Sequence, residues 1–179
     1  MKHHPLLGRD ETTSDLRDSP PRPAARLGRW AGQALLVAIL VAAALGLLGA
    51  RTAEQSVESG SWRLHVEHAQ TTRAGQPAPL HLRIEAFAGF GKTVQVRLCD
   101  DLFDDLDFQN WYPNPAAETS SPPYVVYEFD PPPRGEVLEV SLDARTAPGK
   151  FGEVDDCEVS VLVEDEPVLT TEFTVWRLP

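Results

Sequence analysis

An apolar run from Ala34 to Ala50 is the feature that most constrains this chain. Counted from Trp30, it corresponds to a helix of about 31 Å at 1.5 Å per residue, which matches the hydrocarbon core of a bilayer. Arg29 and Arg51 flank this stretch on either side. The sequence therefore predicts one transmembrane helix over residues 30–50.

Basic residues predict the orientation of that helix. Six precede it, whereas the twenty residues after it carry only Arg51 and Arg63. Because basic residues are retained in the cytoplasm, we expect a single-pass protein of the cell membrane with a cytoplasmic N-terminus and an extracytoplasmic C-terminal domain. A cleaved signal peptide is the alternative, since the apolar run ends in small residues. The long segment ahead of the run and the bulky Leu48 argue against cleavage after Ala50.

Residues 1–29 are rich in charge, Pro, Ser and Thr and show no apolar period. Such a segment buries too little surface to offset its chain entropy, so we expect a disordered cytoplasmic tail. The tail has a net charge of +2 in a chain of −11, which leaves −13 for the rest. A domain this acidic is not expected to bind nucleic acid or anionic lipid by bulk electrostatics.

Residues 51–60 are polar and are predicted to form a short tether, which leaves residues 61–179 for one domain. Apolar residues alternate with polar ones through most of that domain, as is typical of half-buried strands. Seven strands are expected, around residues 62–66, 80–86, 94–98, 124–129, 138–142, 157–163 and 169–175. Turn signals such as Pro131-Pro-Pro-Arg-Gly135 separate them. The fold class is therefore predicted to be all-β, a seven-stranded antiparallel sandwich.

Cys99, Trp111 and Cys157, together with seven strands, resemble the Cys, Trp, Cys arrangement of immunoglobulin-like domains. The whole chain also resembles uncharacterised single-pass membrane proteins of high-GC bacteria, which carry a basic tail, one anchor and a β-sandwich ectodomain. Stretches such as Phe103-Asp-Asp-Leu-Asp107 and Pro113-Asn-Pro115 carry this second resemblance. It implies an immunoglobulin-like ectodomain and no particular activity.

The two cysteines end the third predicted strand and open the sixth, and those strands are antiparallel neighbours in a sandwich of this kind. Outside the cytoplasm thiols tend to be oxidised, so a disulfide between Cys99 and Cys157 is expected. Its loop is long enough for a stabilisation of about 4 kcal/mol. Two free thiols are the alternative.

That pairing would gather four carboxylates at one end of the domain, those of Asp100, Asp101, Asp155 and Asp156. Asp104, Asp105 and Asp107 could join them. A hard cation such as Ca²⁺ would relieve the repulsion between these groups, so they are the candidate metal ligands. A solvated acidic rim without any ion is the alternative, and no other cofactor is expected.

Residues 100–123 form the longest stretch without clear alternation, and a long loop is predicted there. Its aromatic residues are the candidate contacts for a protein partner: Phe103, Phe108, Trp111 and Tyr112. The alternative is that these rings cap the open end of the core.

Catalysis finds no support in the sequence. The histidines after residue 60 (His65, His68 and His81) are expected at the surface, and a zinc site would need a third ligand that the sequence does not place. Motifs for a nucleophilic serine, a zinc protease or a phosphate loop are missing from the sequence. We therefore predict a non-enzymatic, membrane-anchored interaction or accessory module that contacts a membrane or envelope protein. A cation-binding or sensing ectodomain that uses the acidic end is the alternative function.

Overall fold

The computed structural model describes residues 23–46, 49–133, 135–149 and 152–178, and the side chain of Phe108 lies outside this description. The chain divides into two compact units, residues 1–47 and residues 48–179. Each unit is described below by itself.

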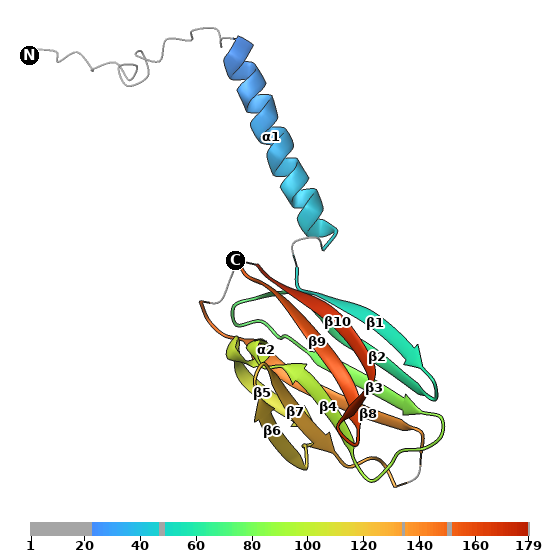
Figure 1. Cartoon of the computed structure of the whole chain (residues 1–179). Coiled ribbons are helices and arrows are strands. Elements are labelled where there is room, and N and C mark those ends of the chain that lie inside the picture. The colour runs from blue at the N-terminus through green and yellow to red at the C-terminus, as the bar shows by residue number, and fades with distance from the viewer. Residues whose placement is uncertain (1–22, 47–48, 134, 150–151, 179) are drawn as a thin grey trace, which may run out of the picture. The chain divides into compact units, whose positions relative to one another are not determined.

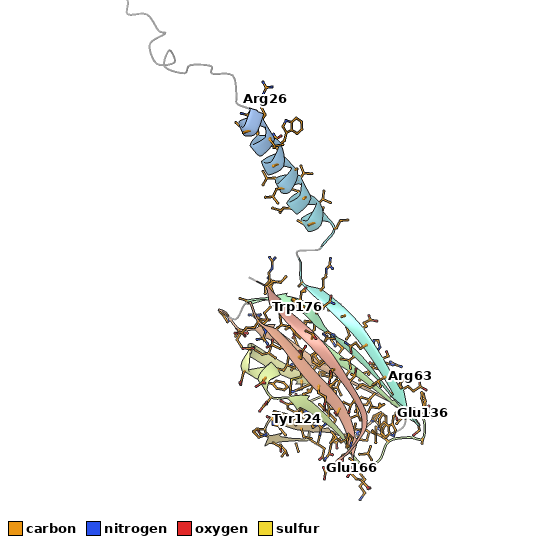
Figure 2. All side chains as sticks on the ribbon, turned by 45° about the horizontal axis from the view of Figure 1, so that its top comes forward. Arg26, Arg63, Tyr124, Glu136, Glu166 and Trp176 are labelled. Atoms are coloured by element: carbon orange, nitrogen blue, oxygen red, sulfur yellow. A yellow bond between two sulfur atoms is a disulfide. The ribbon has the colours of Figure 1, made fainter. Side chains whose placement is uncertain are left out.

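The first unit contains the helix α1 (Pro23–Ala44), whose 22 residues give a length of about 33 Å. Pro23 suits the first helical position, where its missing N–H is not needed. The leucine and valine side chains along α1 are exposed, and Figure 2 shows side chains projecting around the helix, with Arg26 in its first turn. By length and composition, the stretch Ala24–Ala44 can cross a membrane.

The predicted bounds of this helix were wrong at both ends. Residues 23–29, expected in the disordered tail, are helical, and residues 1–22 lie outside the described residues. The helix also ends earlier than predicted, because Gly46 adopts a left-handed backbone conformation (φ 69°) that terminates it.

The second unit is a β domain with one short helix, α2 (Asp101–Asp104). Its strands are β1 (Arg51–Ser59), β2 (Trp62–Arg73), β3 (Leu80–Ala86), β4 (Val94–Cys99), β5 (Leu106–Tyr112), β6 (Ala117–Ser121), β7 (Tyr124–Phe129), β8 (Val137–Thr146), β9 (Val154–Val163) and β10 (Glu166–Leu178).

These strands form one curled sheet in the order β5-β8-β3-β2-β10-β9-β4-β7-β6, with β1 added to β2 (Figure 1). Neighbours are antiparallel except β2 and β10, which run parallel over a short stretch from Thr71 and Trp176. That stretch joins the half containing β5, β8, β3 and β2 to the half containing the last five strands in the order.

Alternation builds the core between the two halves. Leu64 and Val66 of β2, Ile84 of β3, Phe129 of β7 and Val159 of β9 are all completely buried. They belong to one hydrophobic cluster, to which both halves of the sheet contribute side chains. The residues between them face outward, as period-two sequences require.

Several expectations about the domain need correction. All seven predicted strands exist, as β2, β3, β4, β7, β8, β9 and β10, but the sheet has three more, and one strand pair is parallel. The predicted tether over residues 51–60 is mostly the strand β1, so residues 45–50 alone connect α1 to the domain. The predicted long loop over residues 100–123 contains α2, β5 and β6.

Two of the three missed strands share a physical reason, whereas β5 buries Trp111 and is interrupted by a register shift between Leu106 and Phe108. The sides of β1 that face inward carry Ala53, Gln55 and Val57, which are only half-buried, and all of β6 is exposed. Strands that bury little side-chain surface do not need an apolar alternation, so the sequence pattern does not reveal them.

Candidate functional site

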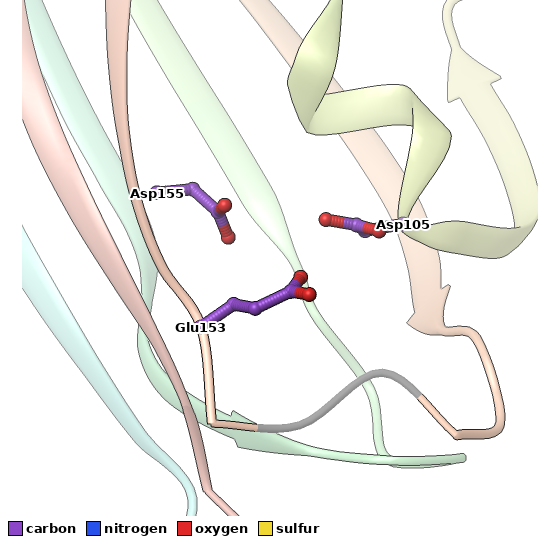
Figure 3. Close-up of side chains that lie close together, drawn as sticks. All are labelled: Asp105, Glu153 and Asp155. Atoms are coloured by element: carbon purple, nitrogen blue, oxygen red, sulfur yellow. The ribbon is translucent and has the colours of Figure 1, made fainter.

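One end of the domain interior is polar, and Arg177 lies at its centre. This residue is near the end of β10 and only 3 % exposed. Its Nη2 atom lies 2.7 Å from a carboxylate oxygen of Asp155, its Nη1 atom lies 3.5 Å from Glu153, and Nη1 also forms an ion pair with Asp105. Figure 3 shows the three acidic side chains converging from two segments of the chain.

Backbone hydrogen bonds fix the segments that supply these groups. The N–H of Arg177 donates to the carbonyl of Glu153 at 3.0 Å, and the N–H of Gly152 donates to the carbonyl of Arg177 at 2.7 Å. Asp105 directly follows α2, and its carbonyl accepts the N–H of Ala147 at 2.8 Å. The buried ion pairs are therefore held by main-chain contacts on both sides.

The acidic side chains offset the energetic cost of burying the Arg177 guanidinium away from water. Burial lowers the pKa of the Arg177 guanidinium, but an arginine remains protonated in a folded protein. A buried cation requires anionic partners, and Asp105, which is itself buried, is the most enclosed of the three. The cluster is therefore an internal ion-pair network centred on Arg177.

A metal could also be held by these carboxylates. One oxygen from each of Asp105, Glu153 and Asp155 lies within 4.8 Å of the others, which is close enough to share one ion. Since the guanidinium of Arg177 pairs with all three side chains, an ion would have to compete with it. Among the described residues, no other group of three such ligands meets this distance.

The predicted aspartates are only partly brought together. Asp155 faces inward and pairs with Arg177, whereas its neighbour Asp156 faces outward and accepts a hydrogen bond from Thr174 at 2.6 Å. Asp101 is exposed on α2, and Asp100 precedes that helix. Successive residues of a strand face opposite sides of the sheet, so adjacent aspartates cannot all converge on one ion.

The cysteines do lie together. Cys99 and Cys157 form a disulfide with their Cα atoms 5.5 Å apart, and β4 and β9 are antiparallel neighbours as expected. The bond therefore links two neighbouring strands near the end of the domain that holds Arg177.

His68 lies inside the domain, which corrects its predicted surface position. It is 3 % exposed, its ring stacks on Phe173 with a centroid distance of 4.8 Å, and its Nδ1 atom lies 3.1 Å from the carbonyl of Ala69. Its Nε2 atom has no hydrogen-bond partner among the described residues. Burial lowers the pKa of His68, so the ring is neutral around pH 7.

A cavity of about 20 Å³ joins His68 to the Arg177 end of the interior. Thr72 and Thr146 also line it, and their hydroxyl groups hydrogen-bond each other at 2.9 Å. A cavity of this size can hold about one water molecule. Most of the other lining residues are apolar, so the cavity connects the polar groups of Arg177 and His68 through a largely apolar pocket.

The predicted partner-binding aromatics separate into buried and exposed residues. Trp111 is buried, with its ring 4.8 Å from that of Tyr127 and 5.8 Å from that of Phe129, and Phe103 packs on Tyr127 at 5.7 Å. These two rings fit the alternative that they cap the core. Tyr112 is 76 % exposed, and the side chain of Phe108 lies outside the described residues.

His65 and His81 lie on the outer face of β2 and β3, as predicted, beside a hollow of about 300 Å³. His81 is paired in register with Glu67, and the Nδ1 atom of His65 lies 2.7 Å from the hydroxyl of Ser56. Tyr112 lines the same hollow from β5. The arrangement offers a polar contact surface with one exposed aromatic ring.

Sequence reasoning missed the central residue of the polar end, although a signal was present. Leu169, Thr171, Phe173 and Val175 alternate with their neighbours along the sequence, and the same period continues to Arg177. Extending the face of Leu64 and Val66 likewise reaches His68. A charged or polar residue at the end of an apolar face is therefore the signal that indicates both Arg177 and His68.

Comparisons with known proteins do not assign this chain to a family. No family model and no curated protein matches the chain. Among solved structures, it is similar to the CARDB domain of the PF1109 protein from Pyrococcus furiosus in complex with di-metal ions, at 12 % identity and a TM-score of 0.39, covering 70 % of this chain and 95 % of that one.

It is also similar to the alkylpurine DNA glycosylase AlkC of Pseudomonas fluorescens bound to DNA containing an abasic site analog. That similarity has 14 % identity and a TM-score of 0.30, and it covers 60 % of this chain and 28 % of the other. With both TM-scores below 0.5, neither similarity carries an inference about this chain.

Proposed function

We propose that this chain is a single-pass, membrane-anchored module whose β domain makes non-catalytic contacts with a protein of the membrane or envelope on the extracytoplasmic side. The observation that carries the proposal is α1, a 22-residue helix that is apolar from Ala34 onward and has exposed side chains, followed after six residues by the first strand of a folded domain. A helix that is apolar on all sides is suited to lipid.

Two observations support the extracytoplasmic location of the domain. Six basic residues lie within the first 29 positions, whereas the twenty residues after the apolar run carry only Arg51 and Arg63, which favours a cytoplasmic N-terminus. The Cys99–Cys157 disulfide is a bond that persists in oxidising compartments.

The strand order supports assignment of the domain to the immunoglobulin-like class. The run β2-β3-β8-β5 has the order of the A, B, E and D strands of such domains, and β10-β9-β4-β7 has the order of G, F, C and C′. The departure is β5, which occupies the D position but precedes β7 in the chain.

We place the partner contact at the hollow beside Tyr112. Tyrosine combines an apolar ring with a hydroxyl group and is enriched at the centres of protein interfaces. Charged and polar groups surround it there, including the ion pair of Arg83 with Glu139 at 2.5 Å. A partner that covers Tyr112 would gain apolar area while its polar groups meet the rim.

Membrane integration is the first test of this function. Full-length protein expressed in a bacterial host should stay with membranes after carbonate washing, and protease added outside the cytoplasmic membrane should digest the β domain while the N-terminal tail stays protected. Release by carbonate, or protection of the β domain, would overturn the proposal.

The contact surface is tested by crosslinking in membranes. Tyr112→Ala should reduce the yield of a crosslinked partner at least several-fold, because the central aromatic ring is lost. Phe87→Ala is the matched control, since Phe87 is also an exposed aromatic but does not line this hollow. Equal loss in both variants would place the contact elsewhere.

A cation-binding ectodomain is the second candidate, and the convergence of Asp105, Glu153 and Asp155 is what favours it. Calorimetric titration of the full chain in detergent with Ca²⁺ tests it directly. Saturable binding that Glu153→Gln abolishes would support this function, and an absence of heat would remove it.

A further inference from the structure

We infer that the end of the β domain where β1 begins rests on the bilayer surface, with Trp176 and Val154 in the membrane interface. The inference rests on the proposed function, because it requires α1 to span the membrane. It adds that the domain is seated on the lipid rather than suspended from it.

Strand register places four residues in one row across this end. Arg51 of β1 pairs with Thr71 of β2, Thr71 pairs with Trp176 of β10, and Trp176 pairs with Val154 of β9. Directly paired residues share a face of the sheet. With neighbouring strands about 4.8 Å apart, the row is about 15 Å long.

The row is exposed at its far end. Trp176 and Val154 are each 51 % exposed, although both are apolar and directly opposite each other. The two side chains therefore form an apolar surface that stays exposed to water after the domain has folded. Figure 2 shows Trp176 at one end of the strands, and Arg63, Glu136 and Glu166 at the opposite end.

Chain connectivity identifies the occupant of this surface. The row starts at Arg51, and only residues 45–50 separate β1 from the turn region that ends α1. Six residues reach at most about 20 Å when fully extended. The hydroxyl of Thr71 also donates to the carbonyl of Gly49 at 3.1 Å, which ties the connection to the row itself. Whatever orientation the domain adopts, this end stays close to the bilayer.

The chemistry of the row suits a lipid interface. Tryptophan prefers the level of the lipid headgroups, where its ring is buried and its N–H is hydrated. Arg51 begins β1 at the same level. The nearby acidic residues face other partners, since Asp155 pairs with Arg177 and Asp156 accepts from Thr174.

Apolar contact rather than charge therefore drives this docking. The domain is strongly acidic overall, so anionic lipids would not attract it. We expect the contact in purely zwitterionic phosphatidylcholine, and we expect it to be insensitive to salt.

The test uses tryptophan emission from the full chain in phosphatidylcholine vesicles whose acyl chains carry bromine close to the headgroup. Trp30→Phe removes the tryptophan of α1, which leaves Trp62, Trp111 and Trp176. Brominated lipid should then quench up to about one third of the emission, because one of three tryptophans contacts lipid. The quenching should disappear when Trp176→Phe is added.

Trp62→Phe is the matched control. Trp62 begins β2 and lies nine residues from Thr71, about 30 Å away along the strand, so this change should keep the quenching and raise its share to about one half of the remaining emission. If the Trp30→Phe protein floats with carbonate-washed vesicles but brominated lipid does not reduce its tryptophan emission, the docking inference is overturned. Failure to float would instead overturn the anchor, and with it both proposals.

Discussion

The interior of the β domain has an apolar middle and a polar end, and the two are stabilised differently. In the middle, Ile84 and Phe129 pack among other apolar groups, where shape and volume decide stability. At the end, Arg177 and Asp105 are buried as charges, and each depends on the other. The comparison teaches that the stability of the polar end should depend on each charged group and on pH, whereas the stability of the middle should depend on side-chain volume alone.

The largest expected effect comes from Arg177→Ala. Removing the guanidinium leaves Asp105 buried without its cation, so the free energy of unfolding should fall by about 3 to 5 kcal/mol. Urea unfolding of the full chain in detergent measures it. Arg83→Ala is the control, since Arg83 pairs with Glu139 on the exposed outer face and its loss should cost far less. Similar losses in both variants would erase the distinction between the polar end and the surface.

A smaller effect is expected in the apolar middle. Ile84→Val removes one methylene group from a fully buried side chain and should cost about 0.5 to 1.5 kcal/mol. This cost should be the same at neutral and mildly acidic pH, because no charged group is involved. A cost that changed with pH would show that the two parts of the interior are coupled.

Acid should weaken the polar end through His68. Burial lowers the pKa of the folded histidine below 6.5, so the unfolded chain binds the proton first as pH falls. Its contribution to stability is therefore complete above pH 6.5 and declines as pH drops from 6.5 toward the lower folded pKa. Urea unfolding at about pH 7.5 and about pH 5.5 measures the decline.

The histidine that is responsible can be assigned by substitution. His68→Leu should remove part of the acid sensitivity, whereas His81→Leu should leave it unchanged, because His81 is exposed on the outer face of β3. If the two variants kept the same pH dependence as the wild type, His68 would not be its source.

The smallest expected effect is that of Ca²⁺ on stability. Because Arg177 already pairs with the three converging carboxylates, millimolar Ca²⁺ should change the melting temperature by less than about 1 °C. A rise of several degrees in a thermal melt would mean that the ion displaces the guanidinium, and it would favour the cation-binding function.

The sequence predicted those parts of the domain that bury apolar surface. Every strand with an apolar period was located, and the pairing of Cys99 with Cys157 followed from the positions of β4 and β9. The strands β1 and β6 were missed because they bury too little to carry the pattern, and β5 was missed because a register shift between Leu106 and Phe108 interrupts its alternation. The sequence left two interpretations of Trp111 open, a partner contact or a cap of the core, and its ring lies in the aromatic cluster of the core.

What the sequence determined by itself is the apolar helix, the seven core strands and the excess of negative charge, because periodicity and composition are local properties. Only the tertiary structure decided which carboxylates meet. Asp155 turns inward to Arg177 while Asp156 turns outward, and Asp105 arrives from a distant segment after α2. Those contacts depend on register and on the curl of the sheet, and both are set by long-range pairing that no single stretch of sequence encodes.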